Sequence, residues 1–300
     1  MLSSIKQNIH IRNFLYLCVR FSGLPFIFRE VFQKNKVTIL LFHDIEPRAA
    51  EKAFRYLLNK YNIISLDDFF DLYRKKEDFP PKSLVITFDD GHKGNYDLLP
   101  ILKKYDIPVT IFLCSGIINT NRHFWYEEAR AKAVHLPLTG EQLKKVPNIK
   151  RLQILKGIGF EQQREYAYPN ALSRKQICEM LPYANFQSHT VFHPCLTECD
   201  DSEAWNEIFV SKRILEEKYG LTVNSIAYPN GDYSDRDIQM SVAAGYEFGL
   251  TVDFGFNTCN TNPFRLKRVS VNDTDNMNEL IAKSSGAWAF LKDVMFRIRT

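Results

Sequence analysis

The sequence has few of the features that mark several common protein classes. Its six cysteines are scattered and include no Cys-Xaa-Xaa-Cys pair, and a chain of this size does not need disulfide staples. We expect reduced, buried thiols, with metal binding at Cys195 and Cys199 as the alternative. No phosphate-binding loop, dinucleotide-binding glycine pattern or serine nucleophile elbow is present. Nucleotide and acyl-enzyme mechanisms therefore have no support.

The chain also lacks extreme composition. It has 300 residues, of which 45% are hydrophobic and 25% charged, so it can bury an ordinary core and is not disordered as a whole. This length fits one large α/β domain or two small ones. The net charge of +4 is too mild to indicate a nucleic-acid partner.

The N-terminal region has neither a secretory signal pattern nor a long hydrophobic run. The apolar residues between positions 14 and 28 are interrupted by Arg20, Gly23 and Pro25, and they fall short of the roughly 20 residues that span a bilayer. We therefore expect no cleavable signal peptide and a cytoplasmic protein, with peripheral contact at the inner face of the membrane as a further expectation.

The positive charge is concentrated in residues 1–36. This segment carries one acid, Glu30, and a net charge of +5, which leaves about −1 for the rest of the chain. Apolar residues alternate with these charges, which suits a basic amphipathic helix on an anionic membrane surface. A helix packed across the folded domain is the alternative. The basic residues are Lys6, Arg12, Arg20, Arg29, Lys34 and Lys36.

Short apolar runs alternate with helix-period stretches from residue 37 onward. This alternation predicts a parallel sheet covered by helices, most economically closed as a barrel, with an open doubly wound sheet as the alternative. A polar, helical insertion interrupts the pattern at residues 119–170. The expected strands are 37–42, 84–88, 108–113, 184–187, 224–228, 246–252 and 268–271, and the expected helices are 50–61, 96–105, 201–219 and 234–244.

Ionisable residues directly follow these strands, where a parallel barrel collects its active-site residues. Asp89 and Asp90 end one strand, and two adjacent buried carboxylates are costly unless a cation binds one of them and the other has a different role. Gly91 permits the sharp exit that this needs. A plain Asp-Asp-Gly turn is the alternative interpretation.

Two histidines, His189 and His193, lie four residues apart after another strand. Neutral imidazole and carboxylate together form a usual ligand set for zinc and similar divalent metals. The alternative is that one histidine is structural and the other exposed.

Three motifs then occur in a recognisable order. TFDDG at residues 87–91, SHTVFHP at 188–194 and AYPNG at 227–231 resemble the polysaccharide deacetylase family, also known as carbohydrate esterase family four or the nodulation-protein-B homology domain. The resemblance covers residues 37–275 and leaves 276–300 as a C-terminal helix. It implies a distorted (β/α) barrel with about seven parallel strands, and metal-dependent hydrolysis of N-acetyl groups on a glycan, either a polysaccharide or a lipid-linked oligosaccharide.

The resemblance also implies roles for individual residues. Asp90, His189 and His193 would hold a divalent metal, with Zn²⁺ as the expected ion, and Asp89 would be the general base. The chemistry is suitable, because three protein ligands leave positions open for water and the acetyl oxygen. A non-catalytic glycan-binding or scaffold protein on a decayed deacetylase fold is the alternative function.

The sequence departs from the family in its general acid. Many members supply a histidine from a late motif, but RLKRVSVND at residues 265–273 contains none. His43, in LLFHDIEP, is the candidate acid instead, as in a subgroup that resembles poly-N-acetylglucosamine deacetylases. A structural role for this strand-end histidine is the alternative.

Other departures surround the motifs. Ala227 stands where the family often has an arginine that orients the catalytic aspartate, and Arg268 could replace it or form a surface ion pair. His92 could line the sugar site or face solvent. Trp125 and Tyr126 could stack on a sugar, although packing of the insertion is the more usual role of such a pair.

Overall fold

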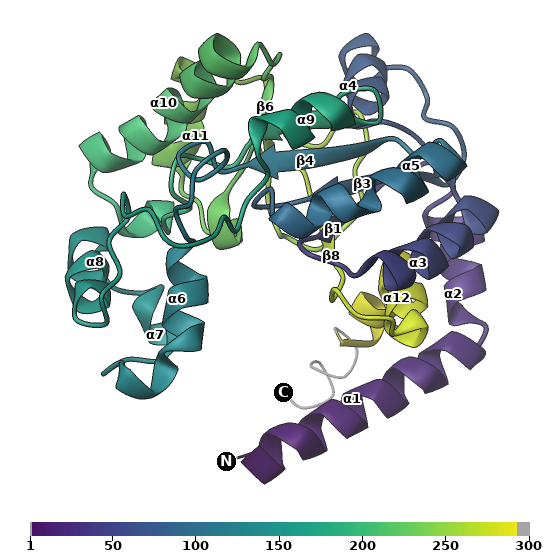
Figure 1. Cartoon of the computed structure of the whole chain (residues 1–300). Helices are drawn as coiled ribbons and strands as arrows, with labels where there is room; N and C mark the ends of the chain where they lie inside the picture. Colours follow the sequence, from purple (N-terminus) through teal and green to yellow (C-terminus); the bar gives the residue numbers. More distant parts are fainter. Residues whose placement is uncertain (1, 293–300) are drawn as a thin grey trace. The chain divides into compact units, whose positions relative to one another are not determined.

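The computed structural model describes residues 2–292, with side chains described from residue 10 onward. The described chain forms two compact units, of which the first comprises residues 2–87, 252–261 and 267–292. The second comprises residues 88–251 and 262–266. Figure 1 follows the elements along the chain by colour.

The first unit contains the N-terminal helices and the strands at one end of the sheet order. β1 pairs in parallel with β8, with Leu40 beside Val269, and β2 pairs in parallel with β3. Both β1 and β3 are buried along their whole length, as expected for parallel strands covered on both faces. The elements are α1 (Leu2–Phe21), α2 (Leu24–Ile27), η1 (Phe28–Phe32), β1 (Thr38–Phe42), α3 (Pro47–Lys60), β2 (Asn62–Ile63), α4 (Leu66–Lys75), β3 (Ser83–Phe88), β8 (Val269–Ser270) and α12 (Met277–Ser284).

The second unit contains four parallel strands and the insertion. β4 pairs with β5, β5 with β6 and β6 with β7. Its elements are η2 (Lys93–Leu98), α5 (Leu99–Tyr105), β4 (Val109–Leu113), α6 (Trp125–Ala131), η3 (Ala133–His135), α7 (Gly140–Leu143), α8 (Asn148–Lys156), α9 (Arg174–Met180), β5 (Ala184–Ser188), η4 (Leu196–Glu198), α10 (Asp201–Tyr219), β6 (Ser225–Ala227), η5 (Pro229–Gly231), α11 (Asp235–Ala243) and β7 (Phe248–Leu250).

The order of the strands confirms the predicted fold class. The order is β7-β6-β5-β4-β3-β1-β8, with β2 beside β3. Successive strands are thus added in one direction, whereas a doubly wound sheet reverses its order at a switch point. The open doubly wound alternative is therefore wrong, and the chain has the parallel, distorted (β/α) barrel type of fold.

The insertion is helical, as predicted, and supplies most of a small buried cluster that also includes Cys195. Trp125, Leu143, Leu155 and Phe160 are buried together in it. The predicted C-terminal helix at residues 276–300 is represented by α12, and its last eight residues, 293–300, lie outside the described part of the chain.

Local sequence signals explain where several helices begin and end. The helix expected from residue 96 begins as a 3₁₀ turn, and its α-helical part starts at Leu99, so that Pro100 occupies the first turn, where it is tolerated. α10 is capped by Asp200, one residue before the expected cap, in a capping box with Glu203. Gly220 ends it in the left-handed conformation, as predicted.

The cysteine prediction is confirmed only in part. Cys114, Cys195 and Cys199 are free and buried, but Cys18 and Cys178 are exposed. The expectation of uniformly buried thiols is therefore wrong.

Within the described residues, no single helix has the length and apolar character needed to cross a bilayer. A bent pair, formed by His10–Phe21 and Leu24–Phe32 at 62° to each other, does meet the criterion of length and composition.

Candidate active site

Three predicted site residues lie together, just after the carboxyl ends of two parallel strands that are separated by β4 in the sheet order. Asp89 and Asp90 follow β3, and His189 follows β5. Asp90 and Gly91 both have positive φ angles, 73° and 71°, so the chain turns sharply after Asp89. A Cβ atom on Gly91 would lie 2.6 Å from Leu113 Cδ2, and together with the positive φ this contact favours glycine at the position. After this turn both carboxylates lie near His189 Nε2, with Asp89 Oδ2 at 3.8 Å and Asp90 Oδ1 at 3.5 Å.

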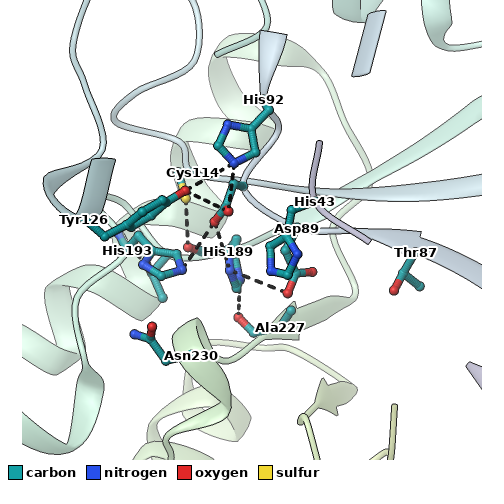
Figure 2. A network of polar contacts seen from close by, with 12 residues as sticks. His43, Thr87, Asp89, His92, Cys114, Tyr126, His189, His193, Ala227 and Asn230 are labelled. Atoms are coloured by element: carbon teal, nitrogen blue, oxygen red, sulfur yellow. Dashed lines mark hydrogen bonds and ion pairs between the residues drawn. The ribbon is translucent and has the colours of Figure 1, made fainter. Parts of the chain in front are cut away.

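Asp90, His189 and His193 form a compact group that could hold a metal ion. Their candidate ligand atoms all lie within 4.8 Å of one another, and all three residues are buried. Asp90 Oδ1 is 3.5 Å from His189 Nε2 and 3.3 Å from His193 Nε2. Figure 2 shows the rings of His189 and His193 turned toward the same point.

The polar atoms of this group fit a cation. Asp90 Oδ1 is buried and receives no hydrogen bond from any described residue. His189 Nδ1 lies 2.7 Å from the carbonyl oxygen of Ala227, which fixes the ring proton on Nδ1 and leaves the Nε2 lone pair facing Asp90. An anionic oxygen that faces an imidazole nitrogen suits a cation bound between them.

The pKa values favour the forms that bind metal. Burial lowers the pKa of His193 to about 3, although the nearby Asp90 opposes this shift, so the ring is neutral at ordinary pH. Burial alone would raise the pKa of Asp90, but the neighbouring His193 and the hydrogen bond from His92 hold it well below its usual range. The group therefore offers one carboxylate and neutral imidazole.

The second oxygen of Asp90 is held by two side chains. Tyr126 donates its hydroxyl hydrogen to Asp90 Oδ2 over 2.8 Å, and His92 Nε2 lies 3.1 Å from the same oxygen. His92 is only 7% exposed, so the expectation that it faces solvent is wrong. Its other ring nitrogen is 3.6 Å from Glu127 Oε1. Because Oδ2 is occupied in this way, Oδ1 is the oxygen left for a metal.

Replacing Tyr126 by phenylalanine tests this arrangement. We expect the Kd for Zn²⁺ to rise by about ten-fold or more, because Asp90 loses the hydroxyl that orients its carboxylate. Competition with a chromophoric chelator measures the affinity. Tyr96→Phe is the matched control, because Tyr96 bonds Glu179 at an exposed position. Equal weakening in both variants would contradict the orienting role of Tyr126.

Asp89 lies beside the metal-binding group without belonging to it. Its Oδ2 is 3.8 Å from His189 Nε2, and the residue is 3% exposed. A buried carboxylate next to a metal position and not used as a ligand can accept a proton from a water molecule there. This placement supports the expected division of roles between the two aspartates.

The loop that carries His193 is held by a residue that sequence reasoning missed. Thr190 and His193 have positive φ angles of 67° and 57°, so the loop is strained and needs support. Glu207 on α10 accepts hydrogen bonds of 2.8 Å from the backbone N–H groups of Val191 and Phe192. Burial raises the pKa of Glu207 to about 7, although these two hydrogen bonds act to lower it. Glu207 is one of many acids on α10, and nothing in the sequence singles it out.

The insertion contributes directly to the site through Trp125 and Tyr126. Trp125 is 3% exposed and donates its indole N–H to the carbonyl oxygen of His193 over 2.8 Å. The guanidinium of Arg151, which is fully buried, lies 4.7 Å from the centre of the Trp125 ring. Packing is thus confirmed for Trp125, whereas Tyr126 has the unpredicted role of a donor to Asp90.

Two further candidate residues, His43 and Arg268, belong to the first unit. The backbone N–H of His43 donates to Asp273 Oδ1 over 2.9 Å, and His43 Nδ1 lies 3.6 Å from Asp273 Oδ2. Arg268 is fully buried, with Nη1 3.5 Å from Thr87 Oγ1. The surface ion pair considered for Arg268 is therefore wrong. Asp273, which comes from the late motif without a histidine, is the partner that the sequence did not identify.

Comparison with known proteins agrees with the motifs. Residues 76–249 match the family model described as polysaccharide deacetylase. The Bacillus subtilis protein YxkH, named as a polysaccharide deacetylase, is 24% identical over 246 residues, 79% of this chain and 71% of the relative. The poly-beta-1,6-N-acetyl-D-glucosamine N-deacetylase of Staphylococcus epidermidis is 27% identical over 235 residues, and the match covers 74% of this chain but only 65% of that relative's length.

Solved structures show the same fold. IcaB from Ammonifex degensii matches with a TM-score of 0.61 and 18% identity, over 84% of this chain and 98% of that one. The Streptococcus pyogenes deacetylase PplD, in complex with acetate, matches with a TM-score of 0.59 and 20% identity, over 82% of this chain and 99% of that one. At these identities the likeness concerns the fold alone.

Proposed function

The chain belongs to the polysaccharide deacetylase family, and on that premise we propose that it hydrolyses the N-acetyl groups of an N-acetylated glycan. The observation that carries the proposal is the buried group of Asp90, His189 and His193, with Asp89 beside it. The names of the staphylococcal relatives favour a polymer of N-acetylglucosamine as the substrate.

Asp90, His189 and His193 would hold a divalent metal, with Zn²⁺ as the expected ion. Such an ion would polarise the acetyl carbonyl and activate the attacking water. The chain's own contribution at this point is to keep both imidazoles in the form that binds metal. The carbonyl oxygen of Ala227 does this for His189 by accepting its Nδ1 hydrogen.

Asp89 would act as the general base. Its carboxylate accepts the proton of the attacking water as the oxygen forms its bond to the acetyl carbon. The adjacent Asp90 is already engaged by Tyr126 and His92 through Oδ2, so it does not compete for this proton. Arg268, buried beside Thr87 at the end of β3, would orient Asp89 in place of the arginine that Ala227 replaces.

His43 would be the general acid that protonates the departing amine. One oxygen of Asp273 lies near His43 Nδ1, and the other accepts a hydrogen bond from the backbone N–H of His43. With Nδ1 toward Asp273, the opposite ring nitrogen, Nε2, points away from it. A carboxylate at Nδ1 also stabilises the imidazolium form that must donate a proton. Asp273 would thus be a positioning residue for His43.

Replacing His43 by alanine is expected to lower the deacetylation rate by about 10²–10⁴-fold and leave the Zn²⁺ affinity unchanged. Asp273→Asn should shift the alkaline limb of the pH–rate profile toward lower pH, because the imidazolium of His43 loses its stabilising charge. Steady-state rates across pH, with a parallel metal titration, measure both effects. Loss of metal on changing His43 would instead make it a ligand.

The direct test of the proposed function is acetate release. The purified full-length chain, loaded with Zn²⁺, is incubated with N-acetylglucosamine oligomers of β-1,6 and β-1,4 linkage, and free acetate is assayed enzymatically. We expect release that a chelator abolishes and Zn²⁺ restores. Oligomers that bind without releasing acetate would favour the non-catalytic glycan-binding alternative.

A further inference from the structure

The N-terminal helices of the first unit carry a concentrated set of exposed apolar side chains. Eight of the seventeen large hydrophobic residues that are exposed in the described chain lie within residues 11–32. We call these eight residues the apolar face. They are Ile11, Phe14, Leu17, Phe21, Phe26, Ile27, Val31 and Phe32. Such clustering marks an interaction surface, because single exposed hydrophobic residues are normal but concentrations of them are not.

Helix α1 is itself anchored by its opposite side. Tyr16 and Val19 are buried, with exposed fractions of 2% and 4%, and they pack with Ala282 and Ala287. The ring of Tyr16 lies 4.4 Å from that of Trp288. α1 and α12 run close to each other in Figure 1. These contacts hold one side of α1 against the C-terminal segment at residues 282–288, and the helix still presents a second side outward.

The outward side has the periodicity of a helix face. Phe14, Leu17 and Phe21 are spaced three and four residues apart and are 63%, 40% and 73% exposed. Phe26 and Ile27 continue the apolar face on α2, and Val31 and Phe32 continue it on η1. The break between α1 and α2 lies at Gly23, whose φ of 80° turns the chain.

The charges around the apolar face are basic. Arg12, Arg20 and Lys34 are exposed. The one acid of residues 1–36, Glu30, is already paired with Arg29 at 2.9 Å and Lys82 at 3.2 Å. A second copy of this chain would bring the same basic residues together, whereas an anionic surface would complement them.

We propose that the apolar face and its basic border dock on the surface of a bilayer that contains anionic lipid. The helices would lie in the interfacial plane and would not cross the bilayer, because Arg12, Arg20 and Arg29 recur along the segment and α1 is held against α12 by Tyr16. The proposal does not rest on the proposed deacetylase activity.

Vesicle co-sedimentation of the full-length chain tests this proposal. We expect binding to vesicles of phosphatidylcholine mixed with phosphatidylglycerol, with much weaker binding to phosphatidylcholine alone or at high salt. Changing Phe14, Leu17 and Phe21 together to serine should weaken binding by about ten-fold or more. The matched control changes three exposed residues of the second unit to serine and should bind as the wild type does. These residues are Val134, Ile149 and Val242, which are 89%, 64% and 54% exposed.

A second measurement covers the case in which the triple variant does not fold. A Phe14→Trp variant should gain a blue-shifted emission with anionic vesicles and be quenched by brominated lipid, unlike Val134→Trp. Equal sedimentation of wild type and triple variant, or no response at Phe14→Trp, would overturn the proposal. The proposal would also be overturned if the wild type formed a dimer that dissociates in the triple variant and did not bind vesicles. Acetate release from soluble oligomers should be unchanged in the triple variant. Membrane binding and deacetylase activity are thus tested independently of each other.

Discussion

Replacing Asp89 by asparagine is expected to lower the deacetylation rate by about 10²–10⁴-fold while the protein still binds Zn²⁺. Asparagine has nearly the same shape but cannot accept the proton of the attacking water. The ligand atoms of Asp90, His189 and His193 are untouched, since Asp89 lies outside their group. Single-turnover acetate release and a parallel chelator competition measure the two properties.

The control for this variant is Asp97→Asn, an exposed carboxylate in η2 that contacts none of the site. It should retain full activity. Folding can be checked by thermal unfolding, and Asp89→Asn should not destabilise the protein, because it removes one of two adjacent buried charges. Full turnover in Asp89→Asn would refute the base assignment, and loss of Zn²⁺ would make Asp89 a ligand.

The parts of the site that the sequence predicts follow from strand topology. Asp89 and Asp90 follow an apolar run, His189 follows the short strand at residues 184–188, and parallel strands place their carboxyl ends at one edge of the sheet. The sequence predicts that Gly91 permits the sharp turn, and Gly91 has the positive φ that this requires. These features depend on local sequence and on one general rule of α/β folds.

Some elements that went unpredicted did have a readable signal. α4 begins with a capping box between Ser65 and Asp68, and α9 begins with one between Ser173 and Gln176. β2 is different, because a two-residue strand carries too short a pattern to recognise. Capping boxes would therefore have predicted α4 and α9, whereas no local signal predicts β2.

The sequence does not predict the residues that support the candidate catalytic side chains. Tyr126 acts on Asp90 across 36 positions, Glu207 acts on a loop 15 and 16 positions away, and Asp273 meets His43 across 230 positions. Each contact depends on how segments pack, and each residue type is common. Motifs identify the atoms that perform chemistry, whereas the residues that hold them emerge only from the tertiary structure.

Changing Asp90 to asparagine is the second substitution with a large expected effect. It should raise the Kd for Zn²⁺ by more than about 100-fold, beyond the 10–100-fold loss typical of changes to supporting residues, because the one anionic ligand of the group is lost. Acetate release should fall with it. The metal-free protein should be as stable as the wild type or more so, since a buried charge whose Oδ1 has no hydrogen-bond partner among the described residues is replaced by a neutral amide.

Thermal unfolding with and without Zn²⁺ measures both halves of this expectation. A ligand at about 100 times its Kd stabilises the folded state by about 2.7 kcal/mol, so Zn²⁺ should raise the Tm of the wild type and of Asp97→Asn but not that of Asp90→Asn. If Asp90→Asn keeps the Zn²⁺-induced rise, the metal lies elsewhere. In that case Asp90 Oδ1, which is buried without a hydrogen-bond partner among the described residues, would need another explanation.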